Sequence, residues 1–332
     1  MCIFAGGTRA SHGQDWARVN LDKSPRHGEY VTIHEAGGRN LQAWVVYPET
    51  KGKAPVVVLI HEIFGLSDWA REMADEVAAA GYIVVEPDLL SGLGPGTGTG
   101  SGTASSSPSV PMDGDHDHPA QNAGTSGAPP FPVPKCDPMN CPQMQEDHAH
   151  QAPRLPLQMS GVPFVPATPG GTAAFPDQSA VVKAVSALPD PQVLADLDAA
   201  ADYGKHLPAA SSKLFVGGFC WGGGKSFLFA THRHDLSAAF VFYGPPPATE
   251  LIKDINAPVY GFYAGNDARI TSTVDATKAA MKAAGKIYDP VIYDGAGHGF
   301  MRAGEAPDAN AANLAARQAG FRRFIQLLGG VR

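Results

Sequence analysis

Residues 213–224, KLFVGGFCWGGG, decide the fold of this chain. A strand-like run at residues 213–216 leads into a glycine-rich turn, and a short helical segment follows. Residues 218–222 have the form glycine–x–nucleophile–x–glycine, with Cys220 where serine is usual. The two glycines are expected where a neighbouring segment passes so close to the turn that a Cβ atom would clash with it. Such a turn exposes the sulfur at a helix N-terminus, which favours a thiolate and a developing oxyanion. The alternative is a buried structural cysteine.

The rest of the chain alternates strand-like and helix-like segments, which predicts an α/β fold with a mainly parallel sheet and helices on both faces. Apolar runs predict strands at residues 30–33, 41–47, 55–60, 82–86, 213–216, 238–243, 257–263 and 287–293. Amphipathic patterns and capping residues predict helices at residues 67–81, 178–188, 191–206, 272–284 and about 307–328, with another that ends at residue 232.

Two further residues complete a possible nucleophilic site. Asp267 follows the strand predicted at residues 257–263, and His298 follows the strand at residues 287–293. Open α/β sheets place their active sites at such carboxyl ends of strands. The chain order nucleophile, acid, base is that of the α/β-hydrolase fold, so we expect His298 to move the thiol proton and Asp267 to orient the imidazole. Taken singly, Asp267 could be a turn former and His298 an ordinary loop residue.

Residues 61–65, HEIFG, follow the apolar run PVVVLI at residues 55–60. An α/β-hydrolase places its second oxyanion donor at this point, so we expect the backbone N–H groups of Ile63 and Trp221 to form the oxyanion hole. A carboxylate at Glu62 would oppose ionisation of a nearby thiol. We therefore expect Glu62 to hydrogen-bond a neutral S–H in the resting state. The alternative is a surface glutamate at the end of a strand.

The middle of the chain has a different composition. Between residues 91 and 171, 27 of 81 residues are Gly or Pro, and hydrophobic periodicity is absent. We interpret residues 1–29 as an N-terminal extension and residues 30–330 as a single domain. A Gly/Pro/His-rich, low-complexity insertion interrupts this domain at about residues 92–175.

The insertion contains side chains that could bind zinc or copper. They are Asp113, Asp115, His116, Asp117, His118, Cys136, Met139, Cys141, Met144, His148 and His150. Their spacing fits no familiar zinc motif, and the tract equally suits a solvated loop over the site entrance. We therefore assign no metal ion to this tract.

Composition excludes several classes of partner. The formal net charge is −7 and basic runs are absent, so nucleic acid and anionic membranes are not expected partners. The sequence has no apolar stretch near the roughly 20 residues that span a bilayer. Four cysteines do not form a disulfide framework, and the start shows no signal peptide. We expect a cytoplasmic monomer or dimer, with a periplasmic or secreted location as the alternative if a leader has been removed.

Four segments together resemble the dienelactone hydrolase family. They are HEIFGLSDWAREMADEVAAAGYIVVEPDLLSG at residues 61–92, GGFCWGG at 217–223, GNDARI at 265–270 and GAGHGFMR at 295–302. The resemblance covers roughly residues 31–90 and 176–328. It implies a triad of Cys220, His298 and Asp267 that needs no cofactor. It also implies that Glu62 holds the resting thiol and releases it when substrate arrives.

The resemblance also bears on the substrate. In the family's best-known member two arginines and a serine clamp the substrate carboxylate. Arg302 matches one arginine, whereas Gly299 stands at the serine position and no arginine lies near Gln178. We expect Phe64 and Phe300, with Trp221 and Tyr243, to make a more apolar pocket, although core packing would explain these aromatic residues equally well.

We therefore expect a hydrolase of a small carboxylic ester or lactone that acts through an acyl-enzyme. The alternatives are a promiscuous esterase or phosphotriesterase of the same fold, and a metal-binding or sensing protein that uses the insertion.

Overall fold

The computed structural model describes residues 14–35, 37–95 and 170–331, which form an eight-stranded sheet with the order β1-β2-β4-β3-β5-β6-β7-β8. The strands are β1 (Gly28–His34), β2 (Asn40–Val46), β3 (Ala54–Ile60), β4 (Ile83–Pro87), β5 (Ala210–Phe219), β6 (Ala238–Phe242), β7 (Val259–Ala264) and β8 (Tyr288–Tyr293). The pairs β1–β2 and β2–β4 are antiparallel, and all other neighbours are parallel. The predicted α/β-hydrolase architecture is confirmed.

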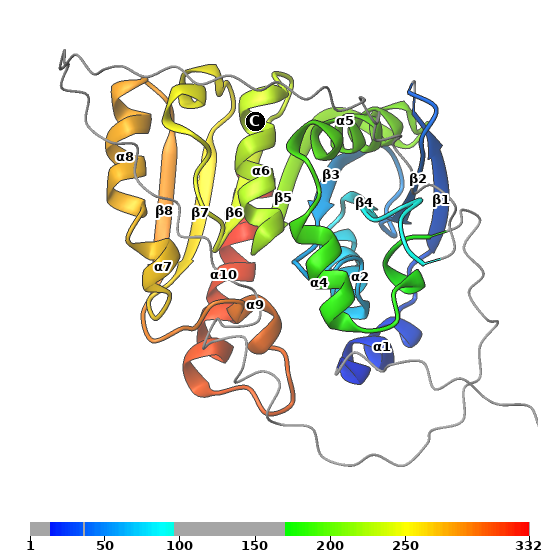
Figure 1. The fold of residues 1–332 in the computed structure, drawn as a ribbon. Helices are drawn as coiled ribbons and strands as arrows, with labels where there is room; N and C mark the ends of the chain where they lie inside the picture. The colour runs from blue at the N-terminus through cyan, green and yellow to red at the C-terminus, as the bar shows by residue number, and fades with distance from the viewer. Residues whose placement is uncertain (1–13, 36, 96–169, 332) are drawn as a thin grey trace, which may run out of the picture.

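Helices cover both faces of the sheet (Figure 1). They are α1 (Asp15–Asp22), α2 (Asp68–Ala79), α4 (Gln178–Ser186), α5 (Asp190–His206), α6 (Trp221–His232), α7 (Ala268–Thr271), α8 (Val274–Ala283), α9 (Phe300–Ala303) and α10 (Ala311–Gly330). One apolar cluster lies between the sheet and α4, α5, α6 and α8, and the other between the sheet and α1, α2 and α10. Central strands are apolar on both faces for this reason.

The parallel central strands bring their carboxyl ends to one edge of the sheet. Glu62 follows β3, Cys220 follows β5, Tyr243 follows β6, Asp267 follows β7 and His298 follows β8. Strand ends that are distant in sequence are neighbours here, because β3 pairs with β5 and β5 with β6 in register. The topology therefore positions the candidate site.

Each predicted strand and helix matches an observed element, with bounds that differ by a few residues. The largest difference is β5, which begins at Ala210 and runs to Phe219, so the strand includes two glycines that we had placed in the turn. The short helices α7 and α9 were not predicted, because four residues carry no periodic signal.

The predicted N-terminal extension includes a helix that packs on the domain. Ala17 of α1 is fully buried, and Asn20 Nδ2 donates to Glu72 Oε1 of α2 at 2.7 Å. Arg26 forms an ion pair with Asp75, which also lies in α2. Residues from about 14 onward thus contribute to the core and do not form a separate extension.

Both described ends of the predicted insertion lie together. Ser91 and Gly170 form an antiparallel bridge, and the Gly171 N–H donates to the carbonyls of Leu90 and Leu93 at 3.1 and 3.0 Å. The metal-ligand tract at residues 113–150 lies outside the described residues. None of the described helices combines the length and apolar character that a membrane span requires. Location and oligomeric state stay predictions.

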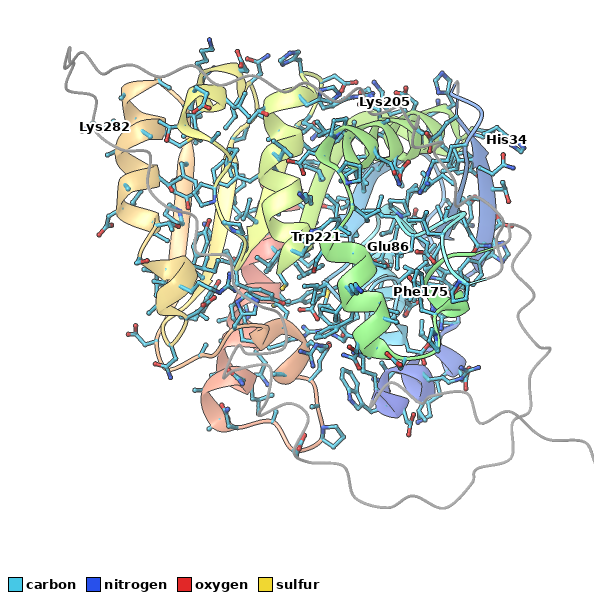
Figure 2. The ribbon with its side chains drawn as sticks, viewed as in Figure 1. His34, Glu86, Phe175, Lys205, Trp221 and Lys282 are labelled. Atoms are coloured by element: carbon cyan, nitrogen blue, oxygen red, sulfur yellow. The ribbon has the colours of Figure 1, made fainter. Side chains whose placement is uncertain are left out.

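Glu86, in β4, is a charged residue type in an apolar interior. It is 1% exposed, and neither carboxylate oxygen has a hydrogen-bond partner among the described residues. Figure 2 shows it in the interior, whereas His34 and Lys282 lie at the periphery. Burial is the main cause that raises the pKa of Glu86 from 4.5 to about 8, against the opposing effect of Arg71.

Replacing Glu86 with Gln should therefore change how stability depends on pH. Between the unfolded pKa and the raised folded pKa, only the folded state holds the proton, so the free energy of unfolding falls as pH rises from about 4.5 to 8. Glu86→Gln should remove up to ~5 kcal/mol of this decline, since one pKa unit corresponds to about 1.4 kcal/mol. Urea unfolding between pH 5 and 9 measures it, with exposed Glu49→Gln as control. If the free energy of unfolding of wild type and of Glu86→Gln depended on pH in the same way, the raised pKa of Glu86 would be contradicted.

Candidate active site

The turn that carries Cys220 has the backbone geometry of a nucleophile elbow. Cys220 has φ 56°, in the left-handed region that residues other than glycine rarely adopt, and its N–H donates to the Phe242 carbonyl at 3.0 Å. A Cβ on Gly218 would lie 2.1 Å from the Gly222 carbonyl oxygen, and one on Gly222 would lie 2.3 Å from the His61 carbonyl oxygen. The predicted reason for both glycines agrees with this geometry.

Cys220, His298 and Asp267 form a continuous hydrogen-bonded chain. His298 Nε2 lies 3.1 Å from the Cys220 sulfur, and His298 Nδ1 lies 2.5 Å from Asp267 Oδ2. Because a carboxylate can only accept hydrogen bonds, Nδ1 of His298 carries a proton and donates to Asp267. Nε2 faces the sulfur. Asp267 is fully buried, whereas Cys220 is half-buried at the surface of the site. This arrangement can transfer a proton between sulfur and imidazole.

The electrostatics of His298 favour its charged form. Burial by itself lowers the tendency of the imidazole to charge, but an ionised Cys220 and the Asp267 carboxylate outweigh it and raise the pKa of His298 to about 10. An imidazolium beside the sulfur stabilises a thiolate, which is the nucleophilic form of cysteine. A charged His298 would therefore favour the nucleophilic form of the neighbouring sulfur.

Glu62 does not bond the thiol in this structure. Its Oε2 accepts from Arg302 Nε at 2.8 Å and its Oε1 accepts from the Tyr243 hydroxyl at 3.3 Å. The carboxylate is 3% exposed, so the guanidinium compensates a buried charge. The contact with a neutral S–H that we expect in the resting state is not present here and stays a prediction.

The two expected oxyanion donors lie on adjoining segments. Trp221 is the first residue of α6, and Ile63 lies in the turn after β3, against which Gly222 of α6 packs. Among the described residues no acceptor takes the backbone N–H of either Ile63 or Trp221. Both groups are thus available for an external oxygen, and their role stays a prediction. Trp221 is labelled at the start of α6 in Figure 2.

The three expected substrate-binding residues have different environments. Phe64 is half-buried, and the guanidinium of Arg302 lies 5.0 Å above its ring. Phe300 is fully buried against Tyr243 and Tyr293, so its position favours core packing over the substrate contact that we expected. Arg302 contacts Glu62, so a substrate anion would have to share it.

Tyr243 has a larger part in the site than the sequence indicated. It is fully buried with φ 41°, its hydroxyl donates to Glu62, and its ring meets that of His298 edge-on at 5.1 Å. The sequence placed Tyr243 only among the aromatic residues of an apolar pocket or of the core. It did not indicate the contacts of Tyr243 with Glu62 and His298.

The described residues contain one notable carboxylate cluster. Glu72, Glu76 and Glu305 bring oxygens within 4.8 Å of one another, a spacing that a metal ion could bridge. Arg317 already donates to Glu76 and Glu305, and the Trp69 indole donates to Glu305 at 2.6 Å. We therefore assign the cluster to charge pairing between α2, α10 and the segment after α9.

Comparison with known proteins gives a consistent result. The model of the dienelactone hydrolase family matches residues 41–126 and 159–331. A protein of Escherichia coli K12, provisionally named a carboxymethylenebutenolidase, is 24% identical over 301 residues, which cover 87% of this chain and 82% of that protein. A Methylorubrum extorquens protein with the same provisional name is 39% identical over 135 residues, 37% of this chain and 46% of that protein.

Solved structures share the fold. A provisionally named dienelactone hydrolase from Klebsiella pneumoniae has a TM-score of 0.61 at 22% identity, with 92% of this chain and 99% of that chain covered. A dienelactone hydrolase-like promiscuous phosphotriesterase from metagenomic libraries has a TM-score of 0.60 at 17% identity, with 92% and 98% covered.

Replacing Asp267 with Asn should remove the negative charge that stabilises the protonated form of His298. The amide carries no charge and can turn its NH₂ group toward the ring, so the pKa of His298 should fall toward its ordinary value and kcat on an activated ester should drop by about 10²–10⁴. Titration of the imidazole by NMR and ester kinetics measure the two effects. Asp294→Asn, the same change at an exposed position near His298, is the control. An unchanged kcat in folded Asp267→Asn would remove Asp267 from the site.

Proposed function

The chain belongs to the dienelactone hydrolase family, and from this premise we propose that it hydrolyses a small carboxylic ester or lactone with Cys220 as nucleophile. The observation that carries the proposal is the hydrogen-bonded chain from Asp267 through His298 to the Cys220 sulfur, at the end of a strained turn. A structural cysteine would have no need of a buried acid–imidazole pair or of a backbone with φ 56°.

This geometry supports the following acylation step. The thiolate attacks the carbonyl carbon and forms the C–S bond, while the carbonyl electron pair moves to oxygen. The N–H groups of Ile63 and Trp221 stabilise that oxyanion. When the tetrahedral intermediate collapses, the C–O bond breaks and the His298 imidazolium donates its proton to the departing alkoxide. In a lactone the departing alcohol stays attached to the acyl group.

Hydrolysis of the thioester then restores the site. Neutral His298 takes a proton from water, whose oxygen attacks the acyl carbon. The C–S bond breaks, the carboxylic acid leaves and the thiolate re-forms beside the imidazolium. Asp267 keeps the imidazole in one tautomer through both half-reactions.

Glu62 is proposed to act before acylation. While it pairs with Arg302 and Tyr243, as here, the sulfur is left to His298, an arrangement suited to attack. In the resting state the Glu62 carboxylate would instead accept from a neutral S–H, which protects the thiol from oxidation and alkylation. Arrival of the substrate would favour the arrangement seen here.

A phosphotriester is the second candidate substrate. A structurally similar protein is described as a promiscuous phosphotriesterase, and the same sulfur could attack phosphorus with the same oxyanion donors. A carbonyl electrophile is favoured because the family is named for lactone hydrolysis. The third alternative, metal binding or sensing, depends on residues 113–150, which lie outside the described residues.

The substrate class is proposed to be neutral. The guanidinium of Arg302 contacts both Glu62 and Phe64. Glu62 therefore already compensates the cation that the family resemblance assigns to a substrate anion. A substrate carboxylate would have to compete with Glu62 for Arg302.

Replacing Cys220 with Ala should abolish ester hydrolysis. The expected loss is on the order of three decades or more in kcat/KM, since members of a nucleophilic triad act as a unit. A short-chain chromogenic ester, a lactone and a phosphotriester should each be assayed. Cys2→Ala is the control for removal of a thiol elsewhere. Wild-type activity in folded Cys220→Ala protein would refute the proposal.

The wild-type enzyme should accept a neutral ester at least as well as an anionic one. A matched pair is para-nitrophenyl butyrate and para-nitrophenyl hemisuccinate, which have the same leaving group and differ at the acyl end in a methyl and a carboxylate. We expect kcat/KM for the hemisuccinate to be equal or lower, because a charge buried without a full partner costs free energy. A preference of about tenfold, or 1.4 kcal/mol, for the anionic ester would contradict this.

A further inference from the structure

The turn of residues 62–65 carries the proposed donor Ile63 and is held from outside the site. The Gly65 N–H donates to the Glu62 carbonyl at 3.1 Å, which closes the turn. His61 Nδ1 lies 2.7 Å from the same carbonyl oxygen, and the ring of His61 is fully buried. The direction of the Ile63 N–H therefore depends on the groups that fix the two ends of this turn.

Thr172 fixes the outer end. The Leu66 N–H donates to Thr172 Oγ1 at 2.9 Å. Gly65 has φ 70°, and a Cβ there would lie 2.4 Å from Thr172 Oγ1, so the hydroxyl lies directly against the turn. Thr172 is 5% exposed, and solvent therefore cannot easily replace its hydrogen bonds.

Asp88, directly after β4, orients this hydroxyl. Thr172 Oγ1 donates to Asp88 Oδ1 at 2.9 Å, and the Thr172 N–H donates to Asp88 Oδ2 at 2.7 Å. Because the hydroxyl hydrogen is directed at a carboxylate, the oxygen lone pairs face Leu66. A charge-assisted hydrogen bond of this kind is stronger than a neutral one and gives the hydroxyl one orientation.

We propose that Thr172, held by Asp88, is a positioning residue that aims the Ile63 N–H at the developing oxyanion. The proposal rests on the proposed function, since it takes Ile63 to be an oxyanion donor. Thr172 acts through the backbone and does not touch the substrate. Its contribution therefore belongs to the transition state, where the oxygen carries negative charge, and should appear in kcat and not in KM.

The test replaces Thr172 with Val, which keeps the branched shape and removes the hydroxyl. Loss of an oxyanion donor costs about 10²–10³ in kcat, so a misdirected donor should cost about 10–100-fold, with KM within about twofold. Thr172→Ser retains a hydroxyl and should restore kcat to within about threefold of wild type. Thr277→Val is the matched control, because Thr277 on α8 is equally buried and its hydroxyl donates to the Thr273 carbonyl.

Two probes of Cys220 separate positioning from general disorder. Iodoacetamide alkylates sulfur by displacement at a saturated carbon, which forms no oxyanion, so its rate should be unchanged in Thr172→Val. A trifluoromethyl ketone adds the thiolate to its carbonyl and leaves an oxyanion, so its affinity should fall in parallel with kcat. Thr172→Ala removes the same hydroxyl and serves if the valine variant does not fold.

Two results overturn the inference alone: a kcat for Thr172→Val equal to that of Thr277→Val, or alkylation slowed as much as ester turnover. Ester turnover at the wild-type rate in the Cys220→Ala variant would overturn the proposed function, and this inference with it.

Discussion

The contact between the first turn of α6 and the carboxyl ends of β3 and β5 is the constraint on which the rest of the site depends. Gly222 packs against the His61 carbonyl so closely that any side chain would force the segments apart, and Cys220 takes up positive φ to complete the turn. Such a backbone costs on the order of 1–3 kcal/mol and persists because the surrounding packing determines it. In return, the sulfur, the Trp221 N–H and the Ile63 turn come together at one point.

The segment that carries His298 is held by buried charges in α9 and directly after it. Arg302 pairs with Glu62 of the β3 turn, and Glu305 pairs with Arg317 of α10 and with the Trp69 indole of α2. Buried ion pairs add little net stability compared with apolar packing, but removal of one partner is costly. Removal of either partner would therefore destabilise the segment in which His298 reaches both the sulfur and Asp267.

The two points at which the long intervening segment leaves and re-enters the fold also affect the site. Ser91 and Gly170 bridge one another, so the long intervening segment begins and ends at one point and leaves the strand order unaffected. The cost of closing a loop grows only slowly with its length, which makes such an insertion tolerable. Because the chain re-enters beside the turn of residues 62–65, Thr172 can join Asp88 to Leu66.

The amino-acid sequence determined the alternation of strands and helices, the elbow at Cys220 and the order of Asp267 and His298, because apolar periodicity and tight turns depend on residues close together in the chain. It did not indicate that α1 packs on α2 or that Tyr243 contacts Glu62 and His298, and it left open whether Phe300 is buried. Arg302 was expected at a substrate anion, yet it pairs with Glu62. Only the tertiary structure decided these contacts, since each joins side chains far apart in sequence whose partner depends on strand order and on how a buried charge is compensated.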